Sequence, residues 1–207
     1  IHTGFMHEDA KNSGVSHLME HIMADSWEKC KGPCPQYWNK KGTISNAFTT
    51  NTFVGYWIMG LNKWSTEMIE YVISASTCDF IKKTILAQEK KAVMEELLKE
   101  MNDPTWKMTN RLYLEYFNNV GIKNNENIPL QLKNLKNFKN SHLEKICKKL
   151  YIPSNIIFTV TGKFNETQIL NIFRRKLKEQ PPIPHKKIVP NVKMKQSVIY
   201  IERAKAE

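Results

Sequence analysis

The sequence feature that most constrains this chain is the run His17-Leu18-Met19-Glu20-His21. A helix advances about 100° per residue, so His17 and His21 lie one turn apart on the same face, with Glu20 between their directions. Two neutral imidazoles are ligands that zinc accepts, and a neighbouring carboxylate can take a proton from zinc-bound water. The run therefore predicts a helix that carries a metal site. The alternative is an amphipathic helix with two solvated or buried histidines.

A third ligand is expected further along the chain, because catalytic zinc usually takes three protein ligands and leaves a fourth position to water. The richest carboxylate cluster lies between Gln88 and Leu98. At helical spacing, Glu89 and Glu96 share an otherwise apolar face, while Glu95 points elsewhere. Carboxylates on such a face are costly to bury unless they are paired or bind a metal. The alternative is a helix at the edge of the core, where both carboxylates reach water.

The order His17-x-x-Glu20-His21, with the glutamate beside the second histidine, is the inverted zincin pattern. With it, the chain resembles the pitrilysin family of zinc peptidases, which includes insulysin and the mitochondrial processing peptidases. That family places a glutamate ligand roughly 75 residues after the second histidine, and 96 − 21 = 75 here. It places a supporting glutamate seven residues before the ligand, and 96 − 89 = 7. The resemblance thus implies His17, His21 and Glu96 as zinc ligands, Glu20 as the base and Glu89 as a residue that orients a ligand.

Other segments agree with the family in order and spacing. Small residues lead into the helix at Gly14-Val15-Ser16, and 46–56 resemble the family's Asn-Ala-aromatic-Thr strand and the tyrosine-bearing strand after it. A Pro-Leu element lies at 127–130, and a Tyr-x-Pro-x-Asn segment at 151–155 is followed by a glycine within 161–164. The resemblance covers nearly the whole chain and implies the family's N-terminal catalytic domain. It also implies that an extended peptide substrate adds to an edge strand at Asn46, Ala47, Phe48 and Thr49. The alternative for Asn46 to Phe48 is a simple turn at the end of a strand.

The coarse pattern is α+β, and the resemblance implies an antiparallel sheet with helices packed mainly on one face. We expect residues 1–207 to form one catalytic domain, with 1–180 as the main body and 181–207 as a linker and terminal strand. Ser13 is expected to be the N-cap of the first helix. The expected helices are 13–24, 65–76, 81–100, 105–117, 132–150 and 166–178, and the expected strands lie within 43–60, 156–160 and 197–202.

The chain has four cysteines, Cys30, Cys34, Cys78 and Cys147. They are too sparse for a disulfide scaffold, which favours a reducing intracellular compartment such as the cytosol or the mitochondrial matrix. The pair Cys30 and Cys34 could be a redox pair or half of a metal site. Its spacing is not Cys-x-x-Cys and no second ligand pair follows, so a loop with incidental thiols is the favoured interpretation.

The net charge of +11 would attract nucleic acid, an anionic membrane or acidic substrates. However, the densest run of lysines, 133–149, is interleaved with apolar residues at helix-like intervals, as on a solvated helix face. Nucleic-acid binding is therefore not expected. No apolar run approaches the length of a membrane span, and no signal-peptide pattern opens the chain. Because the sequence begins at Ile1, inside what reads as an extended segment, we expect a chain cut from something longer.

The predicted reaction is zinc-dependent hydrolysis of extended peptides or precursor segments, with one zinc ion per domain and Glu20 activating the water. Family enzymes enclose their substrate between this domain and a similar one, supplied by the same chain or by a partner. Nothing in this sequence duplicates the first domain, so such a partner is expected. Two other classes remain open. They are a non-catalytic zinc-binding subunit that scaffolds a larger peptidase complex, and a basic binding protein with a coincidental motif.

Overall fold

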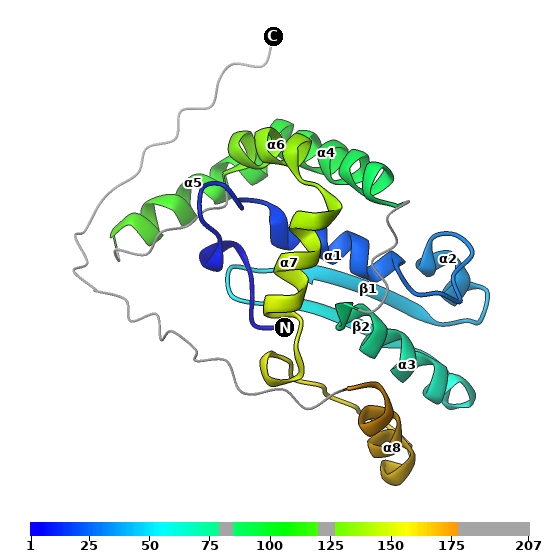
Figure 1. Cartoon of the computed structure of the whole chain (residues 1–207). Coiled ribbons are helices and arrows are strands. Elements are labelled where there is room, and N and C mark those ends of the chain that lie inside the picture. Colours follow the sequence, from blue (N-terminus) through cyan, green and yellow to red (C-terminus); the bar gives the residue numbers. More distant parts are fainter. Residues whose placement is uncertain (79–84, 120–126, 178–207) are drawn as a thin grey trace.

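The computed structural model of the chain describes residues 1–78, 85–119 and 127–177. Its sheet is a hairpin in which β1 (Ile44–Thr49) pairs antiparallel with β2 (Val54–Met59). The register runs from Ile44 opposite Met59 to Thr49 opposite Val54. Figure 1 shows the helices grouped around this hairpin. The predicted α+β class with an antiparallel sheet is confirmed.

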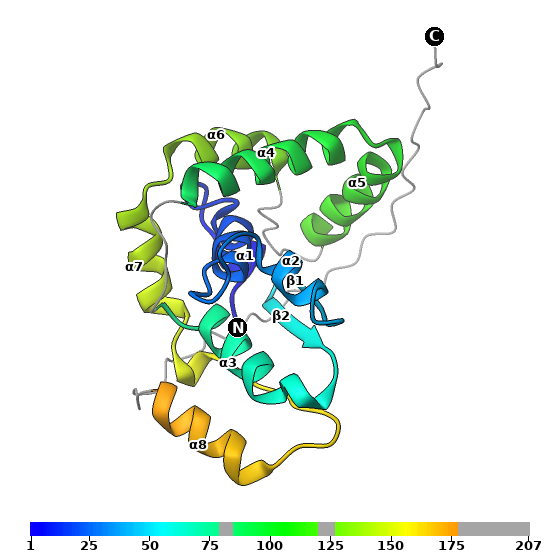
Figure 2. The ribbon, with the colours of Figure 1, turned by 90° about the vertical axis from the view of Figure 1, so that its right-hand side faces the viewer.

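The helix α1 (Val15–Asp25) forms the centre of the domain. It lies between the hairpin and a layer made by α4 (Leu86–Asn102) and α6 (Ile128–Asn137) (Figures 1 and 2). Leu18, Met19 and Met23 are fully buried, so apolar neighbours hold α1 on more than one side. The core around it consists of Val15, Leu18, Met19, Ile22, Met23, Val93, Leu97, Ile128, Leu135, Phe138, Leu143, Cys147 and Tyr151.

The remaining elements surround these layers. The helix α7 (Asn140–Leu150) packs on α1, and α3 (Ser65–Ala75) packs on β2. None of the described helices is long and apolar enough to cross a bilayer. The other described helices are η1 (Phe5–His7), α2 (Cys34–Asn39), η2 (Asn62–Trp64), α5 (Pro104–Asn119), η4 (Pro153–Asn155) and α8 (Glu166–Lys176).

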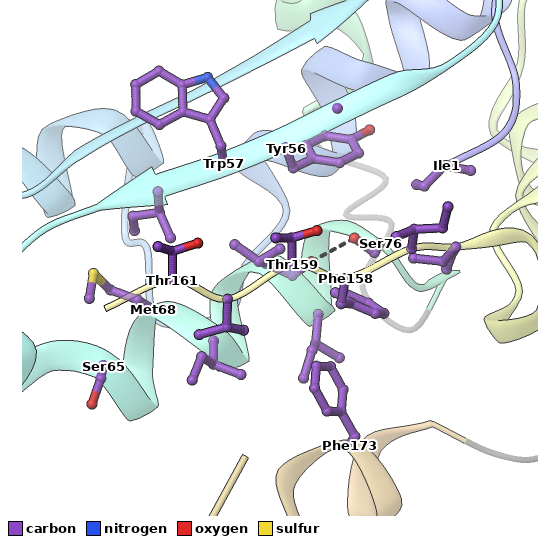
Figure 3. Close-up of a pocket in the computed structure, with 18 of the residues that line it drawn as sticks. Ile1, Tyr56, Trp57, Ser65, Met68, Ser76, Phe158, Thr159, Thr161 and Phe173 are labelled. Atoms are coloured by element: carbon purple, nitrogen blue, oxygen red, sulfur yellow. Dashed lines mark hydrogen bonds between the residues drawn. The ribbon is translucent and has the colours of Figure 1, made fainter. Parts of the chain in front are cut away.

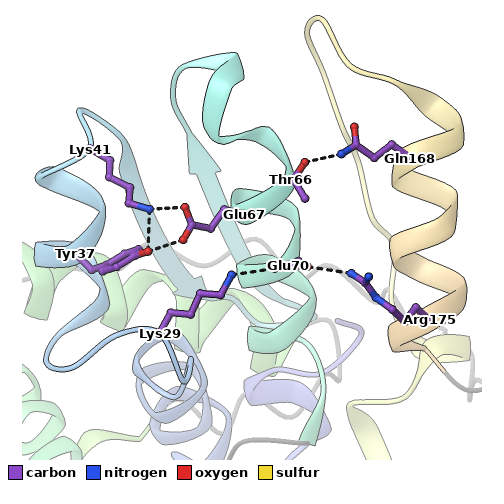
Figure 4. A network of polar contacts seen from close by, with 8 residues as sticks. All are labelled: Lys29, Tyr37, Lys41, Thr66, Glu67, Glu70, Gln168 and Arg175. Atoms are coloured by element: carbon purple, nitrogen blue, oxygen red, sulfur yellow. Dashed lines mark hydrogen bonds and ion pairs between the residues drawn. The ribbon is translucent and has the colours of Figure 1, made fainter.

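Polar contacts tie α3 to two neighbouring parts of the chain (Figure 4). On one side Glu67 accepts hydrogen bonds from Tyr37 and Lys41, and on the other Glu70 lies 3.0 Å from the guanidinium of Arg175 in α8. Partly exposed pairs of this kind contribute only about 0–1 kcal/mol each. A second apolar cluster therefore does more to hold α2 and α3 together, and it consists of Trp27, Cys30, Cys34, Trp38 and Tyr71.

Two expectations about helices are wrong. Ser13 is not the N-cap of α1, because Gly14 occupies that position in the left-handed conformation and the carboxylate of Glu8 accepts the N–H groups of Gly14 and Ser16 instead. The single helix expected over 132–150 is two helices, α6 and α7. Phe138 and the residue after it are extended, and this break lets Phe138 bury its ring in the core.

Two further expectations change. Residues 156–160 have no place in the described sheet, although the strand was expected there. The cysteines at 30 and 34 are not incidental thiols, since Cys30 pairs with Cys34 and Cys78 pairs with Cys147, with Cα separations of 5.2 and 5.7 Å that suit disulfides. The reducing compartment stays a prediction. The expected helix start at 81, the linker and the strand at 197–202 lie outside the described residues.

Candidate metal centre

Two helices bring three potential metal ligands together. His17 and His21 lie one turn apart on α1, with ring centroids 5.0 Å apart. The helix α4 packs on α1 and places Oε2 of Glu96 3.4 Å from Nε2 of His17 and 3.3 Å from Nε2 of His21. The neighbouring Glu95 is largely exposed and forms an ion pair with Lys91. The face of α4 that carries Glu96 is therefore the one that meets the histidines.

The three residues fit a zinc ion by geometry and by chemistry. His17, His21 and Glu96 each offer one ligand atom, and these atoms all lie within 4.8 Å of one another. Two atoms that each lie about 2.1 Å from a tetrahedral zinc ion are about 3.4 Å apart, close to the separations found here. Two imidazole nitrogens and one carboxylate oxygen are a donor set that catalytic zinc uses, with one position left for water.

The buried carboxylate of Glu89 contacts the imidazole of His21 on the side opposite Glu96. Its Oε2 lies 3.4 Å from Nδ1 of His21, and its side chain is only 6% exposed. The other nitrogen of His21, Nε2, faces Glu96. A carboxylate on the far nitrogen fixes the orientation and the tautomer of a ligating imidazole. The structure thus places Glu89 where an orienting residue has to be.

Opposite charges contact one another within this cluster. Burial disfavours the imidazolium form of His21, but contacts with Glu89 and Glu96 outweigh burial and raise its pKa to about 10. The contacts of Glu96 with His17 and His21 hold the pKa of Glu96 well below its usual range. A proton on His21 therefore stabilises the cluster in the absence of a metal, and a bound cation has to displace it.

Glu20 points into a cavity beside the three ligands. The cavity has a volume of about 220 Å³, and His17, Glu20 and Glu96 all line it. Burial raises the pKa of Glu20, and a hydrogen bond from the hydroxyl of Thr49 at 2.7 Å opposes that rise. Glu20 is therefore a carboxylate of raised basicity within reach of whatever occupies the cavity.

The edge strand β1 forms one wall of the same cavity. Three of the residues predicted to bind substrate, Ala47, Phe48 and Thr49, line it. Asn46 does not line it, and its side chain accepts a hydrogen bond from the N–H of Ala47. In the described part of the chain, β1 pairs only with β2, so its other edge is unpaired. An unpaired edge can accept an extended peptide through its backbone.

Sequence reasoning missed Glu8, although this residue supports the helix that carries both histidines. Its carboxylate accepts the N–H groups of Gly14 at 2.8 Å and Ser16 at 2.7 Å. Burial raises the pKa of Glu8 to about 7, and these hydrogen bonds oppose the rise. Glu8 lies six residues before Gly14 and eight before Ser16. These separations are longer than those of ordinary capping patterns, so no local sequence signal marks this cap.

The missed cavity residues are scattered along the chain. They come from three separate elements, η1, α4 and α6, and no single period links them: Phe5, Leu97, Glu100, Ile128 and Gln131. The contact between the partly buried Tyr56 and the buried Tyr151, whose hydroxyl oxygens lie 3.2 Å apart, was also missed. Their burial raises the pKa of both phenols.

Comparison with known proteins gives consistent relatives. The family model described as insulinase (peptidase family M16) matches residues 1–126. An uncharacterized zinc protease of Bacillus subtilis (strain 168), YmfH, is 22% identical over 170 residues, which cover 81% of this chain and 38% of the relative.

Solved structures share the fold at low sequence identity. A protease from Helicobacter pylori has a TM-score of 0.69 and 22% identity, and the match covers 90% of this chain and 45% of that one. The periplasmic protease PqqL from Escherichia coli has a TM-score of 0.73 and 18% identity over 92% of this chain and 22% of that one. The chain thus spans less than half the length of these relatives. The family-model match confirms the resemblance carried by the motifs, and the chain belongs to the insulinase family of peptidases, peptidase family M16.

Proposed function

We propose that this domain is the metal-binding part of a zinc metalloendopeptidase that hydrolyses extended peptides or precursor segments. The observation that carries the proposal is the convergence of His17, His21 and Glu96, with Glu20 lining the cavity beside them. Membership of a peptidase family supports it, as does the name of the curated relative, a zinc protease.

Each residue of the site has a proposed role. His17, His21 and Glu96 would hold zinc, and a zinc ion there would supply Lewis-acid chemistry, the activation of water and the polarisation of a carbonyl group. Glu20 accepts the proton of the attacking water at its carboxylate and returns it to the leaving amine. Thr49 keeps that carboxylate in place through its hydrogen bond.

The substrate is proposed to bind along the unpaired edge of β1. Ala47, Phe48 and Thr49 border the cavity from this strand, so a peptide paired with it passes in front of Glu20. Backbone pairing selects extended or unfolded peptides and places few demands on their sequence. A second homologous domain or subunit is proposed to cover the cavity, and the greater length of the relatives leaves room for one.

Zinc content and peptide cleavage test the proposal together. We expect one zinc ion per wild-type chain, none in Glu96→Ala, and one in the matched control Glu95→Ala, whose side chain lies off the site. Glu20→Gln should keep its zinc, while its cleavage of a fluorogenic extended peptide falls by roughly 10²–10⁴-fold. Cleavage is measured for the chain alone and with a homologous second domain added.

The outcomes separate the candidate functions. A wild-type chain that binds no zinc contradicts the proposal. Bound zinc without Glu20-dependent cleavage, even when the second domain is present, would instead assign the chain to the alternative function, a non-catalytic zinc-binding subunit that scaffolds a larger peptidase complex.

A further inference from the structure

A large and a small cavity border the hairpin, and they differ in chemistry. The larger has a volume of about 660 Å³ and lies between β2 and residues 156–161, and apolar side chains form much of its wall (Figure 3). None of the described residues that line it is an aspartate or a glutamate. The smaller cavity, beside β1, is lined by the carboxylates of Glu20, Glu96 and Glu100. The smaller cavity is therefore the one that suits a charged ligand.

The proposed mechanism uses two of these three carboxylates and leaves Glu100 without a role. Glu100 follows Glu96 by four residues on α4, so both side chains project from the same face of that helix. The side chain of Glu100 is half-buried, and among the described residues its carboxylate has neither a hydrogen bond nor an ion pair. Burial and the nearby Glu96 raise its pKa, because both disfavour a negative charge there. A cation beside Glu100 would stabilise this charge.

The helix α6, which packs on α4, brings a second unpartnered group to the same cavity. Gln131 lines the cavity, its side chain is only 2% exposed, and its Oε1 has no hydrogen-bond partner among the described residues. A buried carbonyl oxygen without a partner costs free energy, and native proteins contain few of them. Gln131 and Glu100 are therefore both complementary to a ligand that donates hydrogen bonds, and Glu100 adds a preference for positive charge.

Apolar side chains complete the wall around these two acceptors. Phe5, Leu97 and Ile128 line the cavity, and all three are buried. Lysine and arginine cover apolar surface with their aliphatic stems and keep the charged head among polar groups. An inorganic cation would leave the apolar wall uncovered. The combination of two acceptors with an apolar wall thus fits a long basic side chain.

A peptide paired with β1 can place such a side chain near Glu100. Ala47 and Thr49 are the partly buried positions of β1 that line the cavity, and Thr49 contacts Glu20 of α1. Alternate side chains of an added strand point to the same face of the sheet, so some of those of the peptide point to the cavity. Four residues span about 6 Å along a helix axis, so Glu100 lies close to the ligand Glu96. The side chain concerned therefore belongs to a residue near the cleaved bond.

We propose that Glu100 and Gln131 form a subsite that binds the side chain of a lysine or an arginine near the cleaved bond of the substrate. The proposal rests on the proposed function, which places the peptide along β1 and the cleaved bond at the metal. Glu100 accepts the charged head, and Gln131 accepts a further hydrogen bond. The two positive charges of a zinc ion are already matched by Glu20 and Glu96, which leaves the charge of Glu100 for the substrate.

A matched pair of peptides tests binding without cleavage. Both are acetylated chains of alanine and threonine that differ in one central residue, either lysine or norleucine, which keeps the stem and lacks the amino group. Fluorescence anisotropy measures their affinity for zinc-loaded Glu20→Gln, alone and with a homologous second domain. We expect the lysine peptide to bind roughly tenfold or more tightly. Adding Glu100→Gln should abolish this difference, and the control Glu95→Gln, whose side chain is exposed, should keep it.

The position of the cut gives a second readout in the wild-type chain. A lysine held by Glu100 fixes the register of the peptide, so moving the lysine along the peptide should move the cleaved bond with it, as measured by mass spectrometry. In Glu100→Gln the cut should no longer follow the lysine, and Glu100→Lys should favour a peptide with glutamate in its place. Gln131→Met removes the second acceptor and should reduce the preference for lysine. An unchanged preference in Gln131→Met would contradict the role given to Gln131.

The outcomes separate this proposal from the proposed function. A lysine preference in binding without Glu20-dependent cleavage supports the subsite and contradicts the peptidase. Equal affinities, or no measurable affinity for either acetylated peptide, overturn the subsite, whereas Glu20-dependent cleavage leaves the peptidase standing. A preference that survives in Glu100→Gln also overturns it. A norleucine peptide with a free amino terminus tests the other source of a cation, and tighter binding of that peptide alone would assign the cavity to an amino terminus.

Discussion

The hydroxyl of Thr49 donates a hydrogen bond to Oε2 of Glu20 at 2.7 Å. This contact joins the edge strand β1 to the carboxylate proposed as the base on α1. Burial raises the pKa of Glu20, whereas a hydrogen bond to the ionised form lowers it. Thr49 therefore helps to keep Glu20 ionised at neutral pH, and the strand proposed to bind substrate also tunes the base.

Replacing Thr49 should shift the pH dependence of cleavage. Thr49→Val removes a contact that lowers the pKa of Glu20, so that pKa rises and the base is protonated at higher pH. We expect the acid limb of the kcat/KM profile to move to higher pH and kcat/KM at pH 7 to fall roughly tenfold. Thr49→Ser keeps the hydroxyl and should keep the wild-type profile. An unchanged acid limb in Thr49→Val contradicts the role given to this bond.

Glu89 should set the metal affinity without binding the metal. Glu89→Ala removes the carboxylate 3.4 Å from Nδ1 of His21, so the imidazole is no longer held for coordination. We expect zinc affinity, measured by competition with a chelator, to fall roughly 10–100-fold. Glu95→Gln on the same helix should leave the affinity unchanged. Equal losses in the two variants would assign the effect to α4 as a whole.

Glu8 should make the metal-free protein less stable as pH rises. Its pKa is raised from 4.5 to about 7 in the folded chain, so its contribution to stability is fully present below pH 4.5 and is lost as pH rises through 7. The decrease in free energy of unfolding is on the order of 3 kcal/mol. Urea unfolding between pH 4 and 8 measures it. Glu8→Gln should remove this decrease, whereas Asp9→Asn should retain it.

A side chain at position 14 should lower the stability of the protein. Its φ of 88° favours glycine, and an added Cβ would lie 3.0 Å from Cβ and Cγ of Gln131. We expect Gly14→Ala to lower the free energy of unfolding by roughly 1–3 kcal/mol. At Gly32 no atom lies within 4 Å of the added Cβ, so Gly32→Ala is the matched control. It should change stability by less than about 0.5 kcal/mol.

The two disulfides should differ in their effect on stability. Cys78 and Cys147 are 69 residues apart in the sequence, whereas Cys30 and Cys34 are four apart. Loop-closure entropy predicts a loss of about 4 kcal/mol when the first pair is replaced by alanines and about 2 kcal/mol for the second. Thermal unfolding of the oxidised protein compares them. Wild-type protein that retains four free thiols by mass spectrometry under oxidising conditions would contradict both pairings.

The helix of the candidate metal centre could be predicted because its chemistry and its periodicity agree. The spacing of His17 and His21 requires a helix, and the apolar residues between them bury it. On α4, the apolar face that contains Glu89 and Glu96 was evident from the 3.6-residue period. The cap from Glu8 could not be predicted. The carboxylate of Glu8 meets the start of the helix only because residues 8–14 fold back on themselves.

The features that were predicted wrongly share one physical cause, since the structure of each depends on residues that are distant in the sequence. The apolar period of 132–150 continues across the break, and burial of Phe138 decides where the helix ends. Ile156 has the extended backbone that the β-branched side chains of 156–160 predict, but pairing also needs an adjacent strand. Cys78 meets Cys147 only because α7 packs against the core.

The separation of the proposed metal ligands along the chain also orders events during synthesis. A nascent chain that ends at α3 carries His17 and His21, while Glu96 arrives 75 residues after the second histidine, on α4. Two imidazoles alone bind zinc weakly, so the proposed site would retain the ion only after α4 has docked on α1. Under the proposed function, hydrolytic competence therefore appears only when the core has closed. On the same proposal, an unfinished chain would lack the complete set of ligands, and a chain that unfolds again would release the metal.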